Sequence, residues 1–193
     1  MLFVESEARA RARKATTITK SAADVLVEQT QAQRKAALPT DIFLSHSFKD
    51  NELILGIALQ IEDLGYKVYI DWRDDPTLDR THVNKKTATL LRDRLCASKC
   101  LLYVTTESSA DSKWMPWELG FKDGQSGKVA IVPVASGRQE EYKGQEYLAI
   151  YYYISVANDT SKRRRLWVQS SPICYITFDR WLEGEAPTER TGQ

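Results

Sequence analysis

Short, wholly apolar runs that alternate with helical segments are the feature of this sequence that most restricts its fold. Such runs lack the polar alternation of a half-exposed strand, so they predict strands buried on both faces. Amphipathic helices are expected between them, at 50–64, at 83–95 and from Trp114 onward. This alternation is typical of βαβ units and predicts a doubly wound parallel α/β sheet of five strands. The five runs are Ile42–Leu44, Val68–Ile70, Leu101–Val104, Val129–Val134 and Ile173–Phe178.

The chain is predicted to hold one α/β domain with an appendage at each end. Residues 1–38 contain no Gly or Pro and are rich in helix formers, which predicts an N-terminal helical extension. The extension is either packed on the main domain or used for self-association. The main domain is expected over 39–182, followed by a flexible tail at 183–193. A thin apolar stripe on the extension consists of Ile18, Ala22, Val25, Ala32 and Ala36.

The composition argues against several classes of function. The 27 Lys and Arg residues balance 26 Asp and Glu residues, so the net charge of +1 gives no support to a nucleic-acid binder. No apolar run approaches the roughly 18 residues that span a bilayer. The three cysteines do not form the pattern of a disulfide framework or a zinc site. With no secretory signal at the N-terminus, we expect a soluble cytoplasmic protein.

The polar segments that follow the predicted strands are the places where a ligand site is expected. Parallel α/β sheets bind ligands at the carboxyl ends of their strands. The sequence has no GxGxxG fingerprint and no Walker lysine motif, so neither standard mode of phosphate binding is predicted. The segments at this edge are 45–50, 71–82, 105–118 and the loop after Val134.

The heptapeptide Trp114–Gly120 contains the densest group of candidate residues. Pro116 suits the first turn of a helix, and Trp114 and Glu118 then share one helix face. Such a pair suits a ribosyl ligand, because the ring can stack on a flat base while the carboxylate accepts hydrogen bonds from ribose hydroxyls. The plain alternative is a core tryptophan beside a glutamate that favours the helix dipole.

Other polar groups at this edge have plainer interpretations. His46 and His82 are expected to be polar loop residues, since no GxSxG nucleophile motif accompanies the serines beside His46. The acidic loop at 71–82 also carries arginines, so a solvated interaction loop is favoured over a cation site. The basic run 162–165 is expected on a solvated surface.

Four segments in order resemble the Toll/interleukin-1 receptor (TIR) domain family. The resemblance runs over about residues 41 to 135, and more weakly to Trp181. It implies a flavodoxin-like doubly wound fold. Within this family, the sequence resembles bacterial TIR proteins of the antiphage-defence, Thoeris-like type. The segments are Asp41–Ser47, Leu64–Asp71, Ala97–Val104 and Ser112–Leu119.

The resemblance gives Glu118 a catalytic role. In enzymatic TIR domains a glutamate on the helix after the third strand cleaves the nicotinamide–ribose bond of NAD, and some of them also carry a tryptophan four residues earlier, as Trp114 is here. Nicotinamide leaves as a neutral base, so a carboxylate beside the oxocarbenium-like centre suffices, with NAD as substrate and no metal or cofactor. The products left open are ADP-ribose and a cyclic isomer. The residues expected to bind the substrate are Ser45, His46, Phe48, Lys49, Asp71, Trp72 and Trp114.

The resemblance also implies partners. TIR domains associate with one another, often through the loop after the second strand, and a downstream effector would sense the nucleotide product. That loop departs from the family pattern here, because 72–82 contains Pro76 but no glycine. The alternative functions are a non-catalytic TIR adaptor and a nucleoside deoxyribosyltransferase-like enzyme. We expect neither a nucleic-acid nor a membrane partner.

Overall fold

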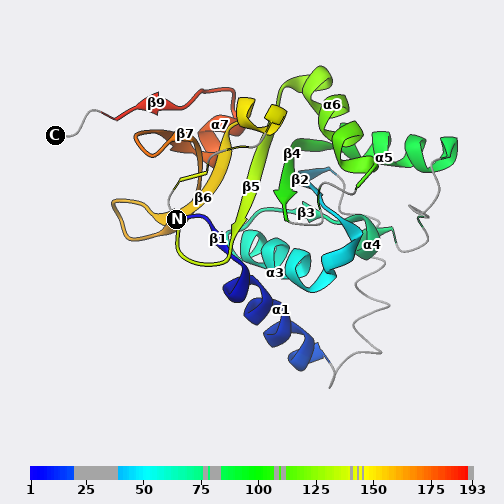
Figure 1. Cartoon of the computed structure of the whole chain (residues 1–193), viewed down its shortest axis with the longest axis horizontal. Helices are drawn as coiled ribbons and strands as arrows, with labels where there is room; N and C mark the ends of the chain where they lie inside the picture. Colours follow the sequence, from blue (N-terminus) through cyan, green and yellow to red (C-terminus); the bar gives the residue numbers. More distant parts are fainter. Residues whose placement is uncertain are drawn as a thin grey trace.

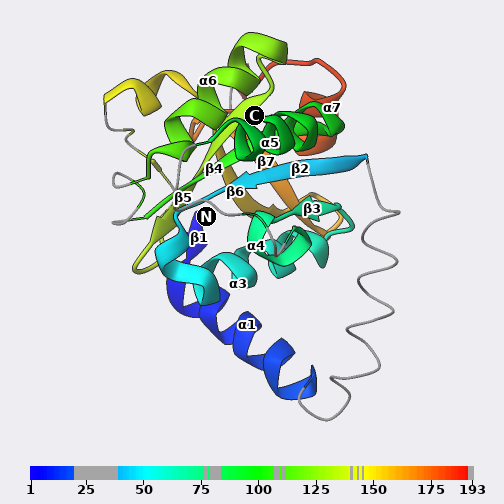
Figure 2. The ribbon, with the colours of Figure 1, turned by 90° about the vertical axis from the view of Figure 1, so that its right-hand side faces the viewer.

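A mostly parallel sheet with helices on both faces forms the centre of the chain (Figures 1 and 2). The computed structural model describes residues 1–19, 39–75, 78, 84–106, 109, 112–139, 141, 142, 144 and 146–190. The doubly wound α/β class predicted from the sequence is confirmed.

The described elements have the following bounds. The strands are β1 (Phe3–Val4), β2 (Thr40–Ser45), β3 (Val68–Tyr69), β4 (Ser98–Thr105), β5 (Val129–Ala135), β6 (Tyr153–Asn158), β7 (Arg164–Ser171), β8 (Cys174–Thr177) and β9 (Thr188–Glu189). The α-helices are α1 (Glu5–Thr19), α3 (Asn51–Glu62), α4 (Asp71–Asp74), α5 (Lys85–Ala97), α6 (Trp114–Ser126) and α7 (Phe178–Leu182). Two 3₁₀ helices are η1 (Phe48–Asp50) and η3 (Glu146–Ile150).

The winding of the sheet reverses at β2. The strand order is β3-β2-β4-β5-β6-β7-β8-β9, and β1 pairs with β5. β2 pairs in parallel with β3 on one side and with β4 on the other. The chain therefore passes to one side of β2 and then returns to the other. The carboxyl ends of β2 and β4 form a topological switch point, which is where open α/β sheets bind ligands.

The sheet is larger than the predicted five strands, with nine in the described part. The predicted run at 173–178 is β8, which pairs antiparallel with β7. The next parallel strand after β5 is instead β6, through Ile131 and Tyr153. The predicted pattern missed β6 and β7, because Ser155 interrupts the apolar run of β6 and β7 mixes polar with apolar residues. Mixed patterns are typical of antiparallel strands with one exposed face.

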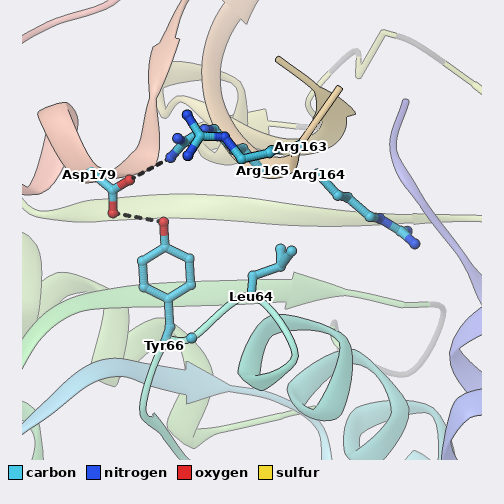
Figure 3. A pocket seen from close by; sticks show the side chains of 7 residues that line it. Leu64, Tyr66, Arg163, Arg164, Arg165 and Asp179 are labelled. Carbon is cyan, nitrogen blue, oxygen red and sulfur yellow. Dashed lines mark hydrogen bonds and ion pairs between the residues drawn. The ribbon is translucent and has the colours of Figure 1, made fainter. Parts of the chain in front are cut away.

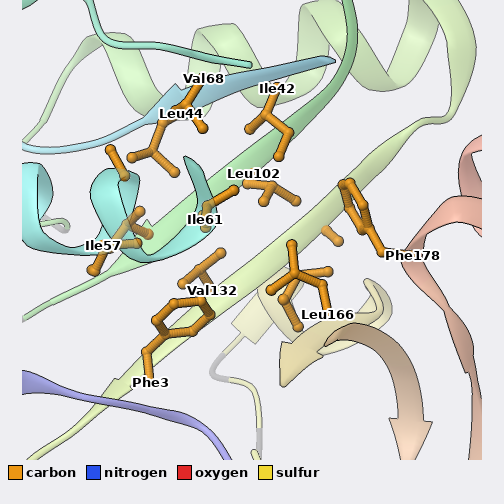
Figure 4. Close-up of a cluster of buried hydrophobic side chains, with 14 of the residues drawn as sticks. Phe3, Ile42, Leu44, Ile57, Ile61, Val68, Leu102, Val132, Leu166 and Phe178 are labelled. Carbon is orange, nitrogen blue, oxygen red and sulfur yellow. The ribbon is translucent and has the colours of Figure 1, made fainter. Parts of the chain in front are cut away.

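Two hydrophobic clusters lie on opposite faces of the sheet. Ile42 and Leu44 of β2 belong to the cluster that contains Ile57 of α3, which Figure 4 shows. Phe43, between them, belongs to the cluster that contains Leu119 of α6. Because successive side chains of a strand point to opposite faces, β2 is buried on both sides, as its continuous apolar run predicted.

Residues 1–19 add a strand and a helix to this core. Phe3 and Val4 pair in parallel with the end of β5, and Phe3 joins the cluster on the α3 face. α1 then packs on α3 (Figure 2), with Ala8 and Ala12 buried. The predicted helix is therefore wrong for residues 3–4, which form a strand. A strand of two residues is too short to show a periodic pattern in the sequence. The predicted apolar stripe lies outside the described side chains.

The C-terminal segment contains an ordered piece. Within the predicted tail, Thr188 and Glu189 form β9, which pairs with β8 through Tyr175 and Cys174. Residues 191–193 lie outside the described part. No helix among the described residues has the length and apolar character needed to cross a membrane.

Candidate active site

A short hydrogen bond joins β2 to α6 at the switch point. Ser45, the last residue of β2, donates its hydroxyl to Glu118 Oε2 at 2.6 Å. Both residues have 0% of their surface exposed. Hydrogen bonds to an ionised carboxylate are among the stronger ones in proteins. The structure therefore brings together two of the predicted site residues, and it fixes the orientation of the candidate catalytic carboxylate.

Local sequence features of α6 place Glu118 at this point. Pro116 lies in the first turn, where its missing N–H is tolerated. Ser112 Oγ accepts a hydrogen bond from the backbone N–H of Met115 at 3.2 Å, which satisfies one of the free donors of that turn. Gly127 ends the helix in the left-handed region, with φ of 62°. The helix therefore begins at Trp114 and buries Glu118 one turn later.

A buried lysine fixes α6 one turn beyond Glu118. Lys122 Nζ donates to the carbonyl oxygens of Leu95 at 3.0 Å and Ser98 at 2.7 Å, and to Gln125 Oε1 at 2.9 Å. Burial lowers the pKa of this ammonium group, but three acceptors compensate its lost hydration. The contact locks α6 to the junction between α5 and β4, so Glu118 projects from a firmly held helix.

Trp114 packs largely into the core on the α6 face. Its ring lies edge-on to that of Trp117, with ring centroids 5.6 Å apart, and it belongs to the cluster that contains Phe43. The residue is 7% exposed. Trp114 and Glu118 lie on the same buried side of α6, as their helical spacing predicted. Most of the surface of the Trp114 ring is buried in the core, as the plain alternative expected.

A second buried polar pair follows β2. His46 Nε2 lies 3.2 Å from Asp71 Oδ1, and the two side chains are 1% and 2% exposed. His46 Nδ1 lies 2.8 Å from the carbonyl oxygen of Leu44, so it carries the proton and donates. Within the described part, Nε2 has no partner with hydrogen-bond geometry. Buried polar atoms are nearly always paired, and in the described part Asp71 Oδ1 is the polar atom placed to pair with Nε2.

His46 lies in the loop after β2, as predicted, and the structure buries it because 45–47 continue from β2 into the core. One prediction about this region is wrong. The acidic loop was expected to be solvated, but Asp71 is buried at the start of α4. Arg73 in the same loop pairs with Glu62 of α3 at 2.8 Å. His82 lies outside the described residues.

Ion pairs hold the first part of this loop against α5. Arg94 contacts both carboxylate oxygens of Asp75, at 2.7 and 2.9 Å, and the Tyr69 hydroxyl donates to Asp75 at 2.8 Å. Burial acts most strongly on Asp75 and would raise its pKa, but Arg94 and Tyr69 together bring that pKa below its usual value. Asp75 is therefore ionised at neutral pH and serves as an anchor of the loop.

The described contacts do not bring three of the predicted binding residues to Glu118. The Trp72 ring packs against the cluster on the α3 face, with Nε1 buried and without a hydrogen-bond partner among described residues. Lys49 is exposed on η1. The side chain of Phe48 lies outside the described part.

Tyr103 is a candidate site residue that the sequence interpretation missed. It is the register partner of Ser45 on β4, so its side chain leaves the sheet on the same face. Burial raises the pKa of the phenol, and Tyr147 and the charge of Glu118 add to the shift. Tyr103 is therefore a neutral hydroxyl on the same face of the sheet as Ser45. The signal that could have found it is its position opposite Ser45 once β2 and β4 are aligned.

A pocket of about 360 Å³ lies elsewhere and contains none of the predicted site residues (Figure 3). In it, Tyr66 donates to Asp179 at 2.8 Å, and Arg165 contacts the other oxygen of Asp179. Arg163 and Arg164 are exposed, as predicted for the basic run. Among the described residues, no group of three or more His, Cys, Asp or Glu side chains is placed to hold a metal ion.

Replacing Ser45 by Ala is expected to lower the free energy of unfolding by about 2 kcal/mol, since it removes a buried hydrogen bond to a carboxylate. Urea denaturation of both proteins measures the change. Ser47→Ala is the matched control, because Ser47 is also buried in this loop but makes no capping hydrogen bond with its side chain. Equal losses in the two variants would contradict the described contact.

Comparisons with known proteins show the family of the chain. Residues 42–167 match the TIR domain family. The chain is 48% identical over 147 residues to "Probable 3' cyclic ADP-D-ribose synthase ThsB'" of Bacillus cereus (strain MSX-D12), which covers 74% of this chain and 75% of that protein. It is 33% identical over 96 residues to "Putative cyclic ADP-D-ribose synthase TIR2" of Cytobacillus dafuensis, covering 49% of this chain and 25% of that protein. The chain therefore belongs to the TIR domain family.

Proposed function

We propose that this chain is a TIR enzyme that cleaves the nicotinamide–ribose bond of NAD, giving nicotinamide with ADP-ribose or a cyclic ADP-ribose isomer. The observation that carries the proposal is the buried Glu118 carboxylate, held at 2.6 Å by Ser45 where β2 ends at the switch point. The names of the two relatives, both cyclic ADP-D-ribose synthases, support the same class of reaction.

The chemistry needs little more than a well-placed negative charge. When the bond between the ribose C1′ and the pyridinium nitrogen breaks, its electron pair goes to that nitrogen, and nicotinamide departs neutral. Positive charge then develops on the ribosyl centre, and a preorganised carboxylate in a buried site stabilises it far better than water does. Glu118 is assigned this role, and Ser45 keeps its carboxylate from rotating.

The second step decides the product. A water molecule that attacks C1′ and loses a proton gives ADP-ribose, whereas a nucleophile within the same molecule closes a ring. Neutral Tyr103 and the edge of Trp114 are the groups proposed to shape the space around C1′. The His46 and Asp71 pair is proposed to bind polar atoms of the substrate, since the two residues follow the carboxyl ends of β2 and β3 and lie 3.2 Å apart there.

The remaining features of the proposal concern the first loop, the partners and the compartment. Phe48, Lys49 and Trp72 are proposed to contact NAD only after the loops around them adjust to the substrate. NAD is the substrate, and no metal or separate cofactor takes part. The enzyme is proposed to self-associate through TIR–TIR contacts. Its product is proposed to be sensed by an effector in bacterial antiphage defence. The cytoplasm is the proposed compartment, because three unpaired cysteines suit a reducing environment.

The test is the conversion of NAD by the purified protein at high concentration, followed by chromatography. We expect nicotinamide to appear together with an equal amount of a second product, which co-elutes either with ADP-ribose or with a cyclic isomer. A non-catalytic adaptor would leave NAD intact. Intact NAD with both the purified protein and lysate from infected cells would contradict the proposal.

A further inference from the structure

The N-terminal strand and helix precede the part of the chain that matches the TIR family, yet one side chain of α1 reaches the end of the loop after β2. We propose that Arg9 of α1 is a positioning residue that holds this loop in its substrate-binding form. Residues 1–19 are then a working part of the active site. This inference rests on the proposed cleavage of NAD, and its test is designed so that the two can fail separately.

The first step is the anchoring of β1 at the carboxyl edge of the sheet. Phe3 and Val4 pair with the last two residues of β5. The backbone N–H of Leu2 donates to the carbonyl oxygen of Gln139 at 2.7 Å, and the N–H of Val156 in β6 donates to that of Met1 at 2.9 Å. β1 therefore pairs with β5, the residue at the start of the chain is bonded to β6, and α1 starts from a fixed point beside the edge where the site lies.

The second step is an unusually close approach of α1 to α3. A Cβ atom built on Gly56 of α3 would lie 1.8 Å from the carbonyl oxygen of Ala8. Only glycine permits this contact, so the backbones of the two helices touch at this point. Because Ala8 directly precedes Arg9, the close approach also fixes where the Arg9 side chain starts.

The third step is the set of carboxylates that Arg9 reaches. Its guanidinium contacts Asp50 Oδ2 at 2.8 Å and Glu52 Oε2 at 3.2 Å, and it is held on its own helix by Glu5. The Arg9 side chain is only 26% exposed. Asp50 ends η1 and Glu52 lies in the first turn of α3. One side chain thus joins α1 to the end of the loop that starts at Ser45.

The conformation of Asp50 supports a tethering role. Asp50 stands at the N-cap of α3, where an aspartate usually accepts a hydrogen bond from a free N–H of the first turn. Its side chain makes no such bond here and turns to Arg9 instead. The loop 45–50 is consequently fixed at both ends, by Ser45 to Glu118 and by Asp50 to Arg9. Replacement of Arg9 therefore releases the Asp50 end of the loop and leaves the hydrogen bond between Ser45 and Glu118 in place.

The same pair of helices offers a matched control. Arg11 of α1 contacts Asp63, at the C-terminal end of α3, at 2.7 and 2.9 Å. Its side chain is 29% exposed, close to the value for Arg9. Arg11→Ala therefore removes an ion pair between α1 and α3, with one carboxylate, at the end of α3 that does not carry the loop. A purely structural role of Arg9 would make the two variants behave alike.

The experiment compares full-length Arg9→Ala, Arg9→Lys and Arg11→Ala by hydrogen exchange and by NAD kinetics. In Arg9→Ala we expect faster exchange in peptides over 45–52 and a roughly tenfold lower kcat/KM, mainly through a higher KM, because a displaced loop binds substrate poorly. Arg9→Lys should recover part of both. Arg11→Ala should show neither, although its melting temperature is also expected to fall. All NAD turnover rates are divided by the concentration of folded protein, so that a loss of folded protein is not counted as a loss of activity.

Two results would overturn the inference. Equal exchange over 45–52 in Arg9→Ala and Arg11→Ala would show that Arg9 does not hold the loop. Faster exchange in Arg9→Ala with a kcat/KM equal to that of Arg11→Ala would show that the tether does not serve substrate binding. If the unsubstituted protein does not cleave NAD at all, the proposed function fails, and the exchange data still decide on the tether by themselves.

Discussion

Replacing Glu118 by Gln is expected to reduce the rate of nicotinamide release from NAD by about 100- to 1,000-fold, the range seen when one preorganised electrostatic partner is removed. The amide has nearly the same shape as the carboxylate, and its oxygen can still accept the hydrogen bond from Ser45. What is lost is the negative charge that faces the developing positive charge on the ribosyl centre. The effect should therefore fall on kcat and kcat/KM together.

The fold of Glu118→Gln should be intact, because a buried neutral amide is cheaper to desolvate than a buried charge. The melting temperature and the circular dichroism spectrum check this. Glu185→Gln is the matched control. Within the described residues, the ion-pair partner of Glu185 is Arg180, and loss of this pair should leave turnover unchanged. If Glu118→Gln keeps more than a tenth of the turnover, the negative charge of Glu118 is not what drives the reaction.

Replacing Gly56 by Ala is expected to lower the free energy of unfolding by roughly 3 kcal/mol, because the added methyl group overpacks the contact between α1 and α3. The new Cβ would lie 1.8 Å from the carbonyl oxygen and 2.4 Å from the carbonyl carbon of Ala8. Both are backbone atoms, so no side-chain rotation relieves the clash, and α1 has to move. For a chain of this length, that corresponds to a fall in melting temperature of about 6–12 °C.

The sign of the Gly56 effect is itself informative. In an open helical position, Ala is better than Gly by up to about 1 kcal/mol. Gly124 of α6 is such a position, because a Cβ built there meets nothing within 4 Å, and Gly124→Ala is the matched control. We expect thermal unfolding to show a lower melting temperature for Gly56→Ala and an equal or higher one for Gly124→Ala. A stable Gly56→Ala protein would contradict the described approach of α1 to α3.

The parallel part of the fold was predictable because its strands are buried on both faces. β2, β4 and β5 each carry a continuous apolar run that local sequence reveals. β1 was not predictable, because two residues show no periodicity and Phe3 and Val4 become a strand only by pairing with distant Val134 and Ala135. β6 and β7 were missed because their serine, arginine and glutamine side chains hide a strand pattern among polar residues.

The candidate site divides in the same way. Glu118 and Ser45 could be placed near one another, since each lies at the carboxyl edge of the sheet and the sequence shows both positions. The burial of His46 and Asp71 could not, because it results from a contact between two loops rather than from the polarity of either. Arg9 gave no sequence signal, since its partner Asp50 is 41 positions away on another element.

Nicotinamide release from NAD, measured side by side for the unsubstituted protein and Glu118→Gln at equal concentrations of folded protein, tests most directly whether the chain cleaves NAD at Glu118. We predict steady release by the unsubstituted protein and a rate at least about 100-fold lower for Glu118→Gln. Release at equal rates would contradict a catalytic role of Glu118. Absence of release from the unsubstituted protein, with lysate of infected cells added, would contradict cleavage of NAD altogether.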